Sequence, residues 1–285
     1  MTTSRRRLAF GTAALALLGS ACTTATAPAV TEQDVNSMKE EISALRSEIT
    51  RTEARGRIEN VFSRYQYLHN VFRDSEIIDL WVKEGTPGIS AQYTNTGVYT
   101  TWDSVMEYHR DRPTPTGKLL IHNSTTPLIE VAGDGQTAKG VWTVTGVESG
   151  LASPENAEKV PDGFFEPGLV NGQKVWAHWV FVRYHVDFKL QDGEWKIWHL
   201  RVVEITRAPF SKDWISFASI LENVPEAGQF HNDILYFGDD GKVVFYPEHD
   251  AGPKTEAYGY RTTEATELHP PLPEEYETFS DTHEY

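Results

Sequence analysis

The chain has 285 residues, with 26 Lys and Arg against 41 Asp and Glu, which gives a formal charge of −15 at pH 7. So acidic a chain lacks the basic footprint that nucleic acids and anionic membrane surfaces require of a partner. Its single cysteine, Cys22, excludes internal disulfides and Cys-rich metal sites, and its 8 Trp, 12 Tyr and 13 Phe exclude general disorder.

Residues 1–22 are typical of an export signal. Three arginines at positions 5–7 precede a short apolar run, and small residues follow at positions 19–21. The stretch from Ser4 to Leu8 resembles a twin-arginine signal, and Ser20-Ala21-Cys22 resembles a bacterial lipobox, although Gly19 stands where Leu is usual. We expect an exported, periplasmic protein, and two interpretations stay open: a lipid anchor on Cys22, or ordinary cleavage near Ala21 or Ala27.

Residues 23–55 are expected to form a linker and then a helical stalk. Residues 23–30 are small, polar and Pro-containing, as in linkers. The a and d positions of a helical stripe follow at spacings of three and four: Val35, Met38, Ile42, Leu45 and Ile49. Two heptads are fewer than a stable coiled coil usually has. The stripe therefore either pairs with a second chain or lies on its own domain, and the second interpretation is the one that we favour from sequence.

Residues 56–215 change from helical to strand periodicity, which predicts one α+β domain. Apolar residues recur at helical spacing over residues 57–81, and a short helix is expected over 102–110. Strands are expected over 119–131, 138–147, 175–188 and 195–205, the last two joined by a hairpin at Asp192-Gly193. Helices followed by a meander of long strands predict N-terminal helices packed over a curved antiparallel sheet.

Four motifs in this region resemble SnoaL-like proteins of the nuclear transport factor superfamily. They are Gly97-Val98-Tyr99, His122 with Pro127 to Val131, Asp134 to Trp142, and Asp192 to His199. The resemblance implies a conical α+β barrel with one deep apolar pocket that binds a small molecule, and a dimer or higher homo-oligomer. The fold alone does not give an activity, because this scaffold carries both enzymes and non-catalytic binders.

Four residues are candidates for acid–base catalysis in such a pocket. His122 and His199 lie on strands that line the pocket in this family, Tyr65 lies on the helix that closes it, and Arg110 ends the short helix. Histidine exchanges protons near neutral pH, tyrosine can protonate a leaving oxygen, and arginine stabilises developing negative charge. For each of them a structural role is the alternative. The expected substrate-contacting residues are His69, Trp142, Trp176, His178 and Tyr184.

A narrower resemblance concerns the reaction. The strands that contain His122 and His199, with Ala208-Pro209-Phe210 after them, look like those of γ-formaldehyde lyases from lignin-catabolising bacteria. This implies a cofactor-free carbon–carbon lyase for a hydroxylated aromatic dimer, which releases formaldehyde and leaves a stilbene. No metal or other cofactor is expected, since no motif for one is visible. The alternatives are another cofactor-free enzyme (a dehydratase, cyclase or isomerase) and a periplasmic binding protein without catalysis.

Residues 216–285 are expected to be an extension of this domain. Residues 235–245 are typical of an added hairpin. The tail from Glu264 is acidic and Pro-rich, with Leu272, Tyr276 and Phe279 as spaced apolar anchors. It is either a loose terminus or an arm that wraps a neighbouring subunit.

Overall fold

The computed structural model describes residues 30–93, 97–110, 115–158, 160, 162–223, 234–237, 243–253 and 259–280. The expected export signal, Cys22 and most of the linker lie outside these residues. The chain divides after Ser43 into two units, which are considered separately. None of the described helices combines the length and apolarity that crossing a membrane requires.

Helix α1 (Glu32–Asn70) is continuous through the position where the sequence suggested two separate helices. Its start is a reciprocal cap, in which Thr31 Oγ1 accepts from the Asp34 N–H at 3.1 Å and the Asp34 carboxylate accepts from the Thr31 N–H at 2.8 Å. Gly56 weakens a helix interior by about 1 kcal/mol relative to Ala, which is too little to end it. Within the second unit the helix buries one face, made of Ala54, Ile58, Phe62, Tyr65, Gln66 and His69.

The apolar stripe at the start of α1 is exposed. Leu45 and Ile49, which belong to the second unit, are 51% and 58% exposed. The interpretation favoured from sequence, that the stripe lies on its own domain, is therefore wrong for these two residues. The other three members of the stripe are exposed as well.

Helix α1 ends in a tight turn after which the chain reverses and contacts the last turn of the helix. The N–H of Arg73 donates to the carbonyl of Leu68 at 3.0 Å, and that of Phe72 donates to the carbonyl of His69 at 3.1 Å, which is the Schellman pattern. Phe72 has φ 57°, a left-handed conformation that costs a non-glycine residue about 1–2 kcal/mol. The 3-10 helix η1 (Asp74–Leu80) begins directly after this turn and brings Asp74 next to His69.

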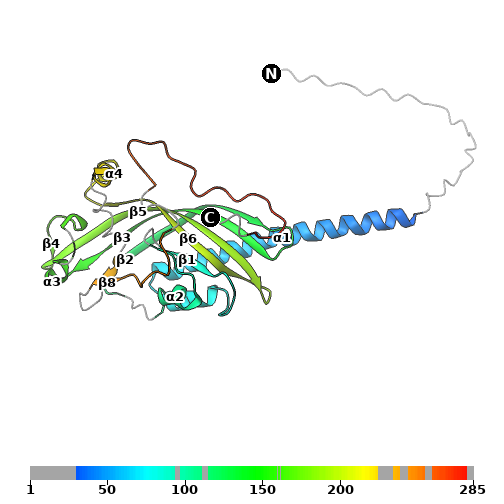
Figure 1. Cartoon of the computed structure of the whole chain (residues 1–285), viewed down its shortest axis with the longest axis horizontal. Helices are drawn as coiled ribbons and strands as arrows, with labels where there is room; N and C mark the ends of the chain where they lie inside the picture. Colours follow the sequence, from blue (N-terminus) through cyan, green and yellow to red (C-terminus); the bar gives the residue numbers. More distant parts are fainter. Residues whose placement is uncertain are drawn as a thin grey trace, which may run out of the picture. The chain divides into compact units, whose positions relative to one another are not determined.

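The sheet is mainly antiparallel, with strand order β1-β6-β5-β3-β2 and β4 (Leu169–Val170) attached to β5. The long strands are β2 (Leu119–Val131), β3 (Thr137–Ala152), β5 (Gln173–Gln191) and β6 (Glu194–Pro209), and short β1 (Ser90–Gln92) runs parallel to β6. The strands curve, and the sheet stays open at β1 and β2 (Figure 1). The predicted hairpin between β5 and β6 is confirmed, because Asp192 and Gly193 both have the positive φ of a type I′ turn.

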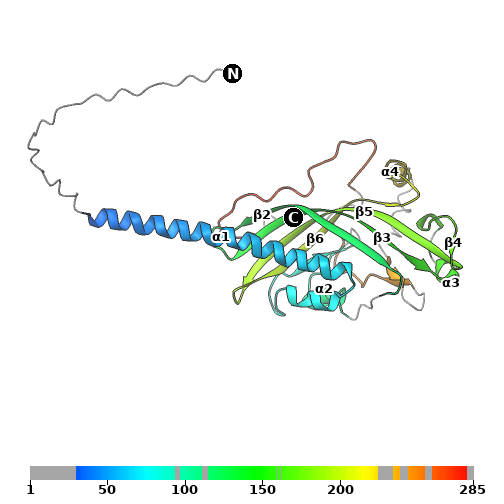
Figure 2. The same ribbon diagram turned by 180° about the vertical axis from the view of Figure 1, so that it is seen from behind.

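The main core lies between α1 and one face of this sheet (Figure 2). The ring of Phe62 lies 4.1 Å from that of Trp142 on β3 and 5.3 Å from that of Tyr184 on β5. Helix α2 (Trp102–Glu107), whose N-terminus is capped by Thr101 and Ser104, completes this layer. The α+β class, with helices packed over a curved antiparallel sheet, is confirmed.

The described part of the C-terminal extension contacts its own domain. After α4 (Trp214–Asn223), strands β7 (Ile234–Phe237) and β8 (Val243–Phe245) form the predicted hairpin. In the tail, the carbonyls of Tyr276 and Glu277 accept from the N–H groups of Gly133 and Asp134 at 2.9 and 3.0 Å. Phe279 packs against Trp198 with 4.8 Å between ring centroids. Residues 276–279 are thus held against their own domain.

A second, smaller core lies where β3 and β5 reach α3 (Pro154–Ala157) and η2 (Asp162–Phe164). Trp176 belongs to it. The ring of His178 lies 4.6 Å from that of Phe164, and its Nε2 lies 3.0 Å from the Phe164 carbonyl. Trp176 and His178 line neither of the two cavities described below, and both are packed in this core. Their expected contact with substrate stays a prediction.

Gly146 generates a prediction about the pairing of β2 and β3. It lies opposite His122, and a Cβ added to it would lie 1.8 Å from the Ile121 carbonyl oxygen and 3.0 Å from His122 Cδ2. Because backbone must move, we expect Gly146→Ala to lower the free energy of unfolding by about 1–3 kcal/mol in urea titrations. Gly56→Ala is the control, since nothing lies within 4 Å of its Cβ, and it should raise stability by about 0.5–1 kcal/mol. Equal stabilities of Gly146→Ala and the native chain would contradict this close approach.

His178 generates a prediction about pH. Burial lowers its pKa to about 4, with a smaller contribution from Arg207, against the opposing hydrogen bond to Phe164. The unfolded residue has a pKa of about 6.5, so between these values the unfolded chain binds a proton that the folded chain does not. This group therefore lowers stability as pH falls from 6.5 towards 4, by at most about 1.4 kcal/mol per pH unit, and has no such effect above that window. Urea titrations at pH 7.5, 6 and 5 should show a shallower decline for His178→Gln, and parallel profiles would contradict the assignment.

Candidate active site

A small cavity, here called the inner cavity, lies between the end of α1 and the sheet face that α1 covers. Its free volume is about 30 Å³, room for one or two water molecules. Its lining includes three valines of β5 and β6 and the tyrosines Tyr93, Tyr108 and Tyr184. The charged or titratable side chains in its lining, other than tyrosines, are His69, Lys118, His122, Glu148, Glu204 and Arg207.

The Asp74 carboxylate holds two histidines at one end of this cavity. Its Oδ1 lies 2.8 Å from His69 Nδ1 and 3.6 Å from His109 Nδ1, and Asp74 and His109 are fully buried. On the far side of His109, Nε2 lies 3.0 Å from the Tyr93 hydroxyl. The turn at the end of α1 therefore joins α1, η1 and the end of α2 through a single carboxylate.

His122 and Glu148 form a second histidine–carboxylate pair. Nε2 of His122 lies 3.1 Å from Oε1 of Glu148, and the rings of His122 and His69 are 5.8 Å apart. The side chain of Asn70, the last residue of α1, holds the backbone of His122 twice: it accepts from the His122 N–H at 2.9 Å and donates to the His122 carbonyl at 3.2 Å. The end of α1 thus holds the backbone of this histidine, and Glu148 on β3 holds its ring.

Arg207 connects Glu148 to a third carboxylate, Glu204. Its guanidinium donates to Glu148 Oε2 at 2.9 Å and to Glu204 Oε2 at 3.3 Å. Burial acts to raise the pKa of Glu148, but Arg207 and the hydrogen bond from His122 outweigh it and hold that pKa well below its usual range. Burial dominates at Glu204 and raises its pKa despite Arg207. The pKa values of two carboxyl groups that share one arginine are thereby shifted in opposite directions. Such a difference lets one carboxyl group act as an acid beside another that acts as a base.

The ionisation of Glu148 determines which nitrogen of His122 carries the proton. An ionised carboxylate only accepts hydrogen bonds, so Nε2 donates to it, and in the neutral ring Nδ1 holds the lone pair. Nδ1 is buried and has no hydrogen-bond partner among the described residues. The Oε1 atom of Glu204 is likewise buried without a partner in the described part of the chain. Two residues of the cavity lining, His122 and Glu204, therefore each contain a buried polar atom without a partner among the described residues.

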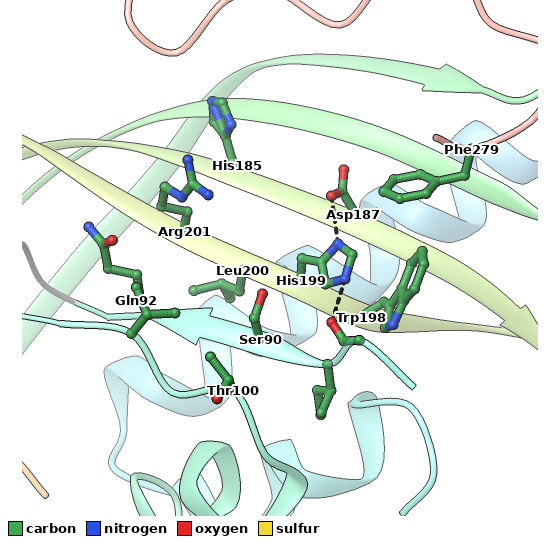
Figure 3. A pocket seen from close by; sticks show the side chains of 13 residues that line it. Ser90, Gln92, Thr100, His185, Asp187, Trp198, His199, Leu200, Arg201 and Phe279 are labelled. Carbon is green, nitrogen blue, oxygen red and sulfur yellow. Dashed lines mark hydrogen bonds and ion pairs between the residues drawn. The ribbon is translucent and has the colours of Figure 1, made fainter. Parts of the chain in front are cut away.

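A larger pocket, here called the outer pocket, lies on the opposite face of β5 and β6 next to β1 (Figure 3). Its free volume is about 300 Å³. His185 and Arg201 lie at one end of it, and Asp187 and His199 lie at the other with Trp198 and Phe279 as aromatic neighbours (Figure 3).

His199 lies in the outer pocket, so the expectation that it shares a pocket with His122 is wrong. Asp187 and His199 are paired in the β5–β6 register, on the face opposite Tyr184 and Glu204. Nδ1 of His199 lies 2.8 Å from Asp187 Oδ2, and Nε2 lies 2.7 Å from the Gly88 carbonyl. Both ring nitrogens thus face acceptors, which gives His199 a bridging role between β6 and the segment before β1.

The other expected site residues divide among the inner cavity, the core and the surface. His69 and Tyr184 line the inner cavity. Tyr65 is packed in the core beside it, with 1% exposure, and burial raises its pKa well above the usual range. Trp142 is also in the core, under Phe62. Arg110 is 42% exposed, pairs with Asp103 at 3.1 Å and lies over the Trp102 ring, so it lines neither cavity.

Several residues that line the inner cavity, or that contact its lining, were not expected from sequence. Asp74 reads as an ordinary acid at a helix start, and His109 as one of several polar residues at the end of the short helix. Glu148 did carry a signal, because it is a lone acid in a strand whose nearest neighbours on the same face are glycines, and such an acid is rarely buried without a partner. Among described residues, no three His, Cys, Asp or Glu side chains are grouped as a metal site requires.

Comparison with known proteins identifies the family of the domain. The family model of the SnoaL-like domain matches residues 50–201, whereas no curated protein matches the sequence. A hexachlorocyclohexane dehydrochlorinase structure shares 14% identity, with 58% of this chain and 95% of that chain covered and a TM-score of 0.43. A putative scytalone dehydratase from Novosphingobium aromaticivorans shares 12%, with 59% and 94% covered and a TM-score of 0.42.

The likeness to these two structures concerns the fold alone at such identities. The family match is the stronger finding, since it covers more than half of the sequence, from the second half of α1 into β6. The chain belongs to the SnoaL-like family.

Proposed function

We propose that this protein is a cofactor-independent enzyme that performs general acid–base catalysis in the inner cavity. The observation that carries the proposal is the buried Nδ1 of His122, which has a lone pair and no partner among the described residues, while Glu148 holds the other side of the ring. A carboxylate behind a histidine fixes its tautomer and stabilises the imidazolium that forms when the ring accepts a proton. His122 is the general base in this proposal.

Glu204 is the general acid. Its raised pKa keeps the carboxyl protonated to higher pH than usual, and its Oε1 faces no described partner. His122 and Glu204 both line the inner cavity, so one substrate can contact both groups. His69, oriented by Asp74, and Tyr184 complete the polar lining as substrate-contacting groups.

The reaction we propose is cleavage of a carbon–carbon bond in a hydroxylated aromatic dimer of the lignin type. His122 removes the proton of the primary hydroxyl, and the carbon–carbon bond to that carbon breaks, which releases formaldehyde. The electron pair of the broken carbon–carbon bond forms the new double bond as the benzylic carbon–oxygen bond breaks. Glu204 protonates the leaving oxygen. The products are formaldehyde, a stilbene and, from a benzylic alcohol, water, so no oxidant or reductant is consumed.

A substrate of this size needs more room than the inner cavity provides. Besides Glu148 and Arg207, the partly exposed members of its lining are Lys118 and Tyr246, and Tyr246 stacks on Tyr108 with 5.6 Å between centroids. Displacement of these two side chains opens the cavity without disturbing the buried histidines. Tyr93 and Tyr108, stacked at 3.7 Å, then offer aromatic surface to an aromatic ring of the substrate.

The proposed reaction is tested by incubating the protein with diarylpropane diols, phenylcoumarans and single-ring hydroxylated analogues. We expect formaldehyde and stilbene absorbance to appear in equal amounts, unchanged by EDTA or by added NAD or flavin. Loss of water without formaldehyde would make the enzyme a dehydratase and overturn the carbon–carbon cleavage. Binding without any product would identify the alternative that was kept from sequence, a ligand-binding protein.

Substitutions test the roles of the residues. Because general acid–base catalysis contributes about 10²–10⁴-fold, we expect His122→Ala and Glu204→Gln each to lower kcat by a factor in this range. Glu148→Gln leaves the ring in place but removes its charge partner, so it should lower kcat with a smaller change in KM. Arg110→Ala is the matched control outside both cavities and should retain near-native activity. Near-native turnover of a folded His122→Ala variant would exclude this residue as the base.

We also propose that the chain is exported, on the basis of residues 1–22. Intact-mass analysis of the protein recovered from cells tests this. A mature N-terminus at a diacylated Cys22 is the expected product of lipobox processing, and a start near Ala21 or Ala27 that of ordinary cleavage. A retained Met1 would contradict export.

A further inference from the structure

The first part of α1 carries apolar side chains that nothing in the described structure covers. Every residue from 31 to 50 is exposed. The stripe defined above is 39–58% exposed at each of its five positions. A helix that served only as a spacer would need no such stripe, because its exposed positions are ordinarily polar.

We propose that this segment pairs with the same segment of a second copy of the chain, as a parallel two-stranded coiled coil. The a positions are Val35, Ile42 and Ile49, and the d positions are Met38 and Leu45. Branching at Cβ in the a positions with Leu at d favours two parallel strands over higher assemblies. Met fits the remaining d position as a flexible apolar residue.

The charged residues beside the stripe determine the direction of pairing. Asp34, Glu41 and Glu48 occupy the g positions, and Lys39 and Arg46 occupy the e positions between them. In a parallel pair each g residue meets the e residue five places further along the partner. Asp34 then meets Lys39 of the second copy, and Glu41 meets Arg46 of the second copy.

An antiparallel pair would bring like charges together. There g positions face g positions and e positions face e positions, so acids would oppose acids and Lys39 or Arg46 would oppose a base. Neither Glu41 nor Arg46 can form an ion pair within its own helix, because the residues three and four places away from each are uncharged. Complementarity with a parallel second copy is the arrangement that uses them.

The shortness of the stripe is offset by the rest of α1. Isolated helices with two heptads are marginal, since most of their cost is nucleation. Here α1 continues to Asn70 and is held by buried residues from Ala54 to His69, so pairing does not carry that cost. The proposal is independent of the proposed reaction, since none of the segment's residues lines either cavity.

Disulfide formation tests the register in the full chain with Cys22→Ser, so that each introduced cysteine is alone. Ile42→Cys places the two thiols at facing a positions, and we expect a cross-linked dimer under mild oxidation. Ser47→Cys, at the outward f position, is the matched control and should cross-link at least tenfold more slowly. Equal rates for the two variants, or no cross-link from Ile42→Cys, would overturn the proposal.

Charge reversal tests the direction independently of any association through the folded domain. Glu41→Arg and Arg46→Glu each create like-charge pairs in a parallel homodimer, so self-association through the stalk should weaken by about three- to tenfold. An equimolar mixture of the two variants restores opposite charges at both contacts, and energy transfer between labelled chains should show preferred heterodimers. Stronger self-association of Glu41→Arg would indicate an antiparallel pair, and random mixing would indicate no pairing here; either result rejects the proposal.

Discussion

The buried carboxylate of Asp74 is the contact on which the arrangement around the inner cavity depends. A fully buried carboxylate is costly unless it is hydrogen-bonded or paired, and Asp74 lies against His69 and His109. To reach them the chain adopts the left-handed turn at Phe72 directly after α1. The same contact draws the end of α2 towards the end of α1, so the local strain at Phe72 is compensated by the joining of three elements.

The fold could be predicted because its signals are local and repeated. Helical spacing over residues 57–70, long alternating strands and the Asp192-Gly193 turn each specify a structure over a few neighbouring residues. The continuity of α1 could not be predicted, because a single Gly56 costs too little to decide between one helix and two. The end of α1 was also missed, since Phe72 is not a residue type that usually marks a left-handed turn.

The site was predicted only in part, because it depends on which face of each strand turns inwards. A shift of one residue moves every side chain of a strand to the opposite face, and β5 and β6 contain two irregularities, one of them between Asp187 and Phe188. His122 and His199 looked equivalent as histidines in apolar strands, yet they lie on opposite faces of the sheet. Asp74, His109 and Arg207 enter the site through contacts between segments distant in sequence, for which a single sequence offers no periodic signal.

Asn70 has a consequence for the sheet as a whole. β2 is an edge strand, and the outward-facing N–H and carbonyl of an edge strand invite pairing with the edge of another molecule. At His122 the amide of Asn70 occupies both groups, in place of a neighbouring strand. The Asn70 side chain therefore prevents edge-to-edge pairing at His122 and also helps to position that residue. A substitution of Asn70 would change both properties together.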